Sequence, residues 1–146
     1  LLHLLLASLS KVVNVEIQPE MFLDWEYPDP TTIRMTMRCN VKGYCSIGFG
    51  SEMDNTDMIA CITYDGVTAT MIDTYGNGHD VPDNDTALGG FNDLIMVSNA
   101  VTANTIECEF DRKLNTGDKY DGVIEVDNEQ SIIWAWYDTR AYVDHQ

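Results

Sequence analysis

Basic residues are scarce in this sequence. The chain of 146 residues has 8 lysines and arginines against 24 aspartates and glutamates, which gives a formal net charge of −16. A surface this negative repels nucleic acid and anionic lipid, so both are excluded as partners. The same charge suits a cationic partner, or a secreted protein that is kept soluble by its charge.

Long apolar runs are missing too, and no stretch is long enough to cross a bilayer. Residues 1–10 are apolar, with small residues near the end of the stretch. They resemble the last part of a secretory signal peptide without its basic beginning, and the alternative is an ordinary first strand. Hydrophobic residues still make up 45% of the chain, enough for one domain with a core over 11–146.

Closely spaced cysteine pairs are absent, which excludes a zinc site of the CxxC type and the CxxCH motif of covalent haem attachment. The four cysteines are Cys39, Cys45, Cys61 and Cys108. An even number in a secreted chain predicts one or two disulfides, with three pairings open if all four are oxidised. Asn84 begins the one glycosylation sequon and lies in a polar loop, which predicts a glycoprotein.

Helical periodicity and hydrolase motifs are also lacking. Neither GxSxG nor HExxH occurs, so the sequence predicts no hydrolase, and we do not expect an enzyme. Alternation with a period of two runs through most of the chain instead. Ile33, Met35 and Met37 share one face of a strand, and Cys108 and Phe110 share a face of another. Short strands separated by turns predict an all-β fold, a single antiparallel β-sandwich of about nine to eleven strands.

One methionine stands out among the residues that are present. Met53 lies in a polar loop, after a glycine-rich strand with Gly48 and Gly50 on either side of Phe49. A methionine in such a loop either folds back over an apolar surface or offers its sulfur to a soft ligand. The residues alone favour the first interpretation.

The chain resembles the DOMON family, over about 22–145. The resemblance rests on the order and spacing of four pieces. They are 47–59 with its glycine-rich strand and Met53, 64–76 with its hairpin, 110–118, and the final strand around Trp134 with the histidine that follows it. The resemblance implies a two-sheet, immunoglobulin-like sandwich in an extracellular protein.

The same resemblance implies a cofactor. Haem-binding members of the family, such as the cytochrome domain of cellobiose dehydrogenase, hold a non-covalent b-type haem between a methionine and a histidine. The matching residues here are Met53 and His145, and we expect Phe49, Met58 and Trp134 to contact the porphyrin. The predicted function is one-electron transfer to a redox partner protein or a neighbouring cytochrome, with iron as the bound metal.

Three other interpretations remain open. A haem-free module of the same fold would bind carbohydrate or protein through aromatic residues such as Trp25 or Trp136. A structural sandwich in a larger extracellular assembly is another alternative. In the loop around His79, the acidic residues Asp80, Asp83 and Asp85, with nearby Asp93, could bind Ca²⁺, although the pattern is more typical of solvated charge. His79 itself is interpreted as a surface residue.

Overall fold

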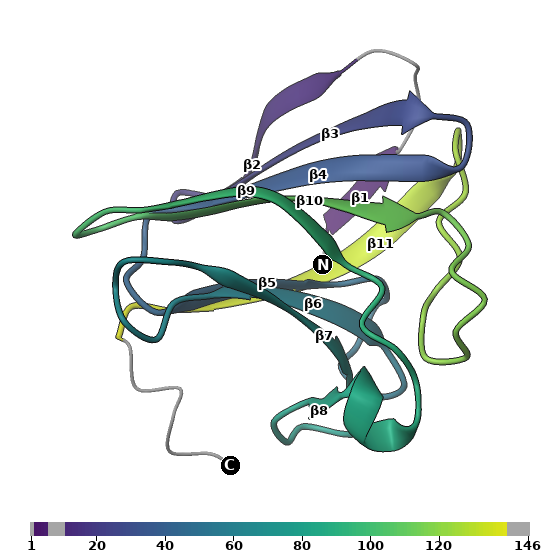
Figure 1. Ribbon diagram of the computed structural model, residues 1–146. Coiled ribbons are helices and arrows are strands. Elements are labelled where there is room, and N and C mark those ends of the chain that lie inside the picture. Colours follow the sequence, from purple (N-terminus) through teal and green to yellow (C-terminus); the bar gives the residue numbers. More distant parts are fainter. Residues whose placement is uncertain (1, 6–10, 140–146) are drawn as a thin grey trace.

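Two antiparallel sheets face each other and enclose the core (Figure 1). The structure is a computed structural model and describes residues 2–5 and 11–139. The six-stranded sheet has the order β1-β11-β5-β6-β7-β8, and the five-stranded sheet has the order β2-β3-β4-β10-β9. Eleven strands within the described residues confirm the predicted sandwich.

The bounds of the elements are as follows. The six-stranded sheet consists of β1 (Leu2–Leu5), β11 (Glu129–Tyr137), β5 (Tyr44–Gly48), β6 (Asp57–Ile62), β7 (Thr70–Tyr75) and β8 (Asp83–Asn84). The five-stranded sheet consists of β2 (Val12–Gln18), β3 (Met21–Asp29), β4 (Thr32–Cys39), β10 (Ile106–Lys113) and β9 (Ile95–Val101). A single 3₁₀ turn, η1 (Asp85–Leu88), follows β8.

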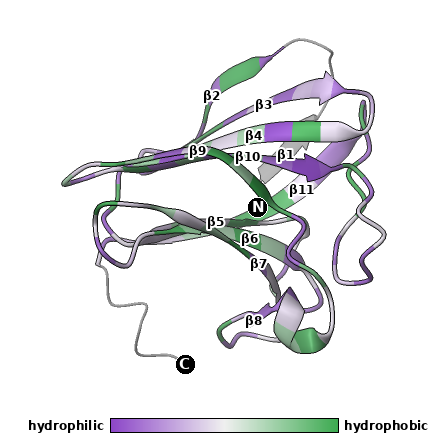
Figure 2. Ribbon diagram, in the orientation of Figure 1, coloured by the Kyte–Doolittle hydropathy of each residue, from purple (hydrophilic) through white to green (hydrophobic). Residues whose placement is uncertain are grey.

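Alternating side chains build the core. Ile33, Met35 and Met37 of β4 are buried, as are Cys108 and Phe110 of the adjacent β10. Figure 2 shows the corresponding alternation of apolar and polar residues along β4. Alternation places every second residue between the sheets, so these two strands confirm the predicted period of two.

Both disulfides join one sheet to the other. Cys39 of β4 is bonded to Cys45 of β5, and Cys61 of β6 is bonded to Cys108 of β10. All four side chains are buried in the core. The prediction of one or two disulfides is therefore confirmed at two, and the pairing is settled by the arrangement of the sheets.

Two segments at the margins of the sheets complete the fold. The segment 123–126 is irregular: Ile124 is buried, and its N–H donates to the carbonyl of Leu114 rather than to a strand partner. Leu2–Leu5 forms β1 and pairs with β11, while the signal-peptide interpretation of 1–10 stays a prediction. Within the described residues, no helix has the length and apolar character that a bilayer crossing requires.

Candidate functional site

A pocket lies on the outer face of the six-stranded sheet. Its volume is about 230 Å³. The residues that line it are Tyr44, Ser46, Met53, Met58, Ala60, Ile62, Ile72, Thr74, His79, Asp80, Val81, Pro82 and Ala135. The neighbours of these residues along β5, such as Cys45 and Ile47, point into the core instead. The pocket and the core therefore use opposite faces of the same strands.

Small side chains form the floor of the pocket. Ser46, Ala60 and Ala135 lie on three adjacent strands, and the register pairs Ser46 with both of the others. Met58 and Ile62 are buried at the two ends of β6, yet neither belongs to the core cluster between the sheets. A floor of small residues between larger apolar ones makes a shallow hollow that suits a flat, apolar ligand.

Two loops border the pocket, and backbone hydrogen bonds join them. The first follows β5 and contains Met53, and the second, 76–82, follows β7 and contains His79. The N–H of Asn55 donates to the carbonyl of Gly76 at 2.9 Å, and the N–H of Gly76 donates to the carbonyl of Thr56 at 2.8 Å. A Cβ on Gly76 would lie 1.8 Å from the Met53 carbonyl oxygen, so only glycine allows this approach.

Two hydroxyl groups of the pocket, those of Ser46 and Thr74, are already engaged as donors. Ser46 Oγ donates to the carbonyl of Ile59 at 2.8 Å, and Thr74 Oγ1 donates to the carbonyl of Met58 at 3.1 Å. A hydroxyl has one hydrogen to donate, so neither can donate to a ligand without losing its present bond. Toward a ligand, these two hydroxyls can therefore act only as acceptors.

The predicted haem contacts divide between the two faces of the sheet. Met53 and Met58 line the pocket. Phe49 and Trp134 pack against the core on the other face and do not line this pocket, and their contact with a porphyrin stays a prediction. Trp134 donates its ring N–H to Gln18 at 3.1 Å, and the ring of Phe49 lies against Arg112. The reason is alternation: Trp134 is adjacent to Ala135, which takes the pocket-facing position.

The structure also tests one of the predicted histidines. His79 is exposed, as expected of a surface residue, yet it borders the same pocket as Met53. His145 lies outside the described residues. Trp25 is buried in the core, so the suggestion that it forms a recognition surface is wrong, whereas Trp136 is partly exposed.

A second group of polar residues was missed by the sequence analysis. Asp57 of β6, Asp73 of β7 and Arg112 of β10 are buried between the sheets, where they approach Asp121 of the loop after β10. The period of two could have revealed these residues. Arg112 lies two positions after the buried Phe110, and Asp73 lies two positions after the buried Met71, so each occupies a core-facing position. A charged residue at a core-facing position needs a partner or an ion.

Sequence comparison agrees with this architecture. A model of the DOMON domain matches residues 18–137. The chain belongs to the DOMON family. No curated protein sequence matches this DOMON chain.

One of the solved structures that the DOMON chain resembles is the cytochrome domain of Myriococcum thermophilum cellobiose dehydrogenase. The TM-score is 0.52 at 19% sequence identity, and the match covers 70% of this chain. It covers 54% of that domain, about half of its length. At this identity the likeness shows a shared fold.

Proposed function

We propose that this chain is a secreted b-type haem domain that transfers single electrons, with Met53 as one axial ligand of the iron. The observation that carries the proposal is the position of Met53 at the edge of an apolar pocket, where its thioether has no role in the core. Membership of the DOMON family and likeness to a domain named as a cytochrome support the same conclusion.

The residues of the pocket fit haem in their chemistry. A porphyrin needs apolar cover, and a low-spin haem iron accepts a thioether together with an imidazole. The pocket offers apolar side chains, hydroxyls that are already engaged, and both types of ligand side chain. Its volume of about 230 Å³ is below the usual range for a ligand site, so part of the macrocycle would extend beyond it.

The family resemblance assigns the second axial position to His145, and His79 is the rival within the pocket. Six residue steps separate His145 from Thr139, the last described residue, and they span at most about 20 Å. The strand that leads there, β11, contributes Ala135 to the pocket. A bound haem would supply one-electron chemistry, and a thioether ligand favours its ferrous form.

The surroundings implied by this proposal are extracellular. Two disulfides that join the sheets are typical of proteins from oxidising compartments. A net charge of −16 favours a redox partner with a cationic docking surface, in a larger extracellular complex or as a separate protein.

A sulfur-deleting substitution tests the proposal. Haem is added to the purified protein, and absorption spectra are recorded in the oxidised and dithionite-reduced forms. The wild type should show a Soret band and sharp α and β bands after reduction. Met53→Leu keeps the volume of the side chain but removes the ligand, so haem should remain bound while the reduced α band weakens and the potential falls.

Met96→Leu is the matched control, because Met96 is a half-buried methionine of β9 in the other sheet. It should leave the spectrum unchanged. A protein that gains no Soret band after haem addition would refute the proposal.

The same assay distinguishes the two histidines as candidates for the second axial ligand. His145→Ala should lose haem or bind it much more weakly, whereas His79→Ala should keep both the haem and its spectrum. The reverse result would assign the axial position to His79, next to Met53 at the border of the pocket.

One observation favours a haem-free binding module as the second candidate. The ring of Tyr44 at the pocket lies 6.4 Å from that of Tyr137, and Tyr137 is half exposed. This pair of rings, on the pocket face of the sheet, could stack against a sugar ring. A protein that fails the haem test but retains an oligosaccharide, with retention lost in Tyr137→Ala, would establish this candidate.

A further inference from the structure

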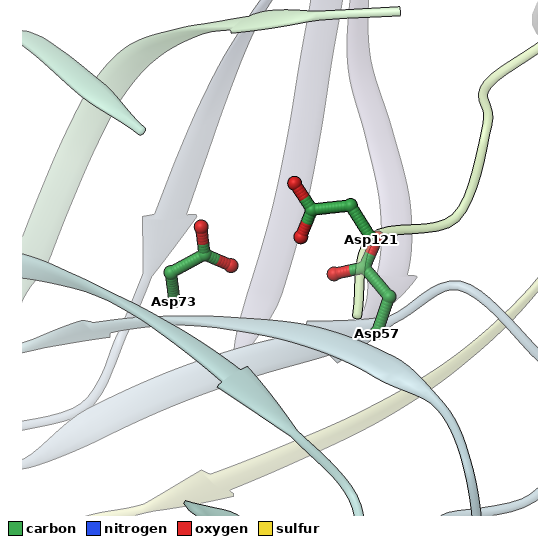
Figure 3. Close-up of side chains that lie close together, drawn as sticks. All are labelled: Asp57, Asp73 and Asp121. Atoms are coloured by element: carbon green, nitrogen blue, oxygen red, sulfur yellow. The ribbon is translucent and has the colours of Figure 1, made fainter. Parts of the chain in front are cut away.

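Buried carboxylates gather on the core side of the strands that form the pocket. Asp57, Asp73 and Asp121 each offer an oxygen, and these oxygens all lie within 4.8 Å of one another. Figure 3 shows the three side chains converging from β6, β7 and the loop after β10. Asp85 of η1 and Asp93 adjoin them, because both interact electrostatically with Asp121.

The hydrogen bonds of this group are incomplete. One oxygen of Asp57 accepts from Arg112 at 2.8 Å and from the N–H of Gly122 at 2.9 Å. One oxygen of Asp73 accepts from the N–H of Asp93 at 2.9 Å. The other oxygens of Asp57 and Asp73, and both oxygens of Asp85 and Asp121, are buried without a hydrogen-bond partner.

Asp85 is the most informative member. It has no exposed surface, although it lies in a turn between exposed residues such as Asn84 and Thr86. Solvated charge, the interpretation favoured by the sequence, is therefore wrong for Asp85 and remains correct for Asp80 and Asp83. A fully buried carboxylate with two unpartnered oxygens requires a proton or a cation.

The positive charge near these carboxylates is too small to neutralise them. Arg112 contacts Asp57 at 2.8 Å and Asp121 at 3.6 Å, and one guanidinium faces five carboxylates. Burial, reinforced by the neighbouring aspartates, raises the pKa of Asp73 to about 7 and that of Asp85 to about 8. Burial also raises the pKa of Asp57 to about 6, against the opposing effect of Arg112. Without a cation, protons therefore occupy part of the cluster near neutral pH, and a cation would have to displace them.

We propose that Asp57, Asp73, Asp85 and Asp121 bind one calcium ion inside the sandwich, with Asp93 beside them. Calcium takes six to eight oxygen ligands at about 2.3–2.6 Å, so two oxygens on opposite sides of one ion lie about 5 Å apart. The oxygens of Asp57, Asp73 and Asp121, all within 4.8 Å of one another, match that distance. Carboxylates from strands and loops offer the irregular, oxygen-only set that calcium accepts more readily than magnesium does.

The bound ion would connect the two ends of the loop that borders the pocket. Asp73 lies in β7 just before loop 76–82, and Asp85 lies in η1 just after it. This proposal does not depend on haem, because its ligands lie on the opposite face of the strands from Met58 and Thr74.

Calcium binding is tested on the wild-type chain after treatment with EDTA and removal of the chelator. Isothermal titration calorimetry should give one calcium site per chain. Thermal unfolding followed by circular dichroism should shift upward by about 5–10 °C at a calcium concentration near 100 times Kd. Magnesium should give a smaller shift, and choline chloride at matched ionic strength should give none.

Substitutions locate the site. Asp85→Asn and Asp73→Asn each remove one charge and keep the shape, so both variants should fold without calcium and be at least as stable as the calcium-free wild type. Each should lose the calcium-dependent shift. Asp83→Asn is the matched control, an exposed aspartate two positions before Asp85, and it should keep the full shift.

Three results would overturn the proposal. The first is a calorimetric titration of the wild type that shows no site; the cluster would then hold protons instead. The second is an equal shift with magnesium, which would remove the assignment to calcium. The third is an undiminished calcium shift in both Asp73→Asn and Asp85→Asn.

Discussion

Neighbouring residues of a strand can serve two different sites. Met58 lies in the wall of the apolar pocket, while Asp57, one position earlier, lies among the buried carboxylates between the sheets. The same division separates Thr74 from Asp73 on β7. Successive side chains of a strand point to opposite faces, so one pair of strands forms a wall of both sites.

Asp24 shows how a buried charge is accommodated when partners are available. It alternates with the core residues Leu23 and Trp25 and so lies on the outer face of β3, where Arg38 donates to both of its oxygens at 2.7 Å and the N–H of Asn14 donates at 2.6 Å. Burial acts to raise the pKa of Asp24, but these donors outweigh it and the pKa is lowered.

This lowered pKa predicts a pH-dependent stability. Asp24→Asn should reduce the free energy of unfolding by about 1–2 kcal/mol near pH 7, the lower part of the range for charged hydrogen bonds because Arg38 is partly exposed. The contribution is complete above the unfolded pKa of about 4 and is lost as pH falls through the lower folded pKa. Urea unfolding of both proteins near pH 7 and near pH 2.5 measures the difference.

Asp111→Asn is the control, since Asp111 is more exposed than Asp24 in its ion pair with Arg34, and its effect should be smaller. A loss in Asp24→Asn that is equally large at both pH values would contradict the electrostatic explanation.

At the scale of elements, loop 76–82 is the segment that relates the two sites. It lies between β7 and β8, and its residue His79 lines the pocket. Backbone hydrogen bonds hold its first residue, Gly76, against the loop that contains Met53. An ion between Asp73 and Asp85 would restrain both of its flanks.

Hydrogen exchange tests that connection. Amides of 77–84 should exchange at least about tenfold more slowly with calcium than in EDTA, because local opening must then release the ion. Amides of β9 in the other sheet supply the internal reference and should change little. Equal protection of 77–84 in both conditions would show that the ion does not restrain this loop, even if it binds.

At the scale of the whole molecule, two disulfides join the sheets, and they close loops of very different length. Cys61 and Cys108 are 47 residues apart, whereas Cys39 and Cys45 are 6 apart. Closing a longer loop removes more entropy from the unfolded chain, which corresponds to about 4 kcal/mol for the first bond and about 2 kcal/mol for the second.

Removal of each pair should therefore have different effects. Cys61→Ala with Cys108→Ala should lower the melting temperature more than Cys39→Ala with Cys45→Ala. Each double variant is the control for the other, because all four side chains are buried and leave comparable cavities. Thermal unfolding under non-reducing conditions gives the comparison, and equal losses would contradict the loop-entropy explanation.

The sequence predicted the features that depend on local periodicity. Ile33, Met35 and Met37 alternate with polar residues, so the strand and its buried face followed directly. Met53 was singled out at this level too, because a glycine-rich strand followed by a methionine loop is a local pattern of the family, and its role as a ligand stays a prediction. The all-β fold and the presence of disulfides were determined at this level.

Only the tertiary structure decided which sites the two faces form. Alternation separates Trp134 from Ala135 but does not say which faces the core; the structure packs Trp134 against the core and places Ala135 at the pocket. The disulfide pairing and the cluster around Asp85 depend on segments far apart in the chain. Their meeting is set by how the two sheets pack, which a period of two along one strand does not encode.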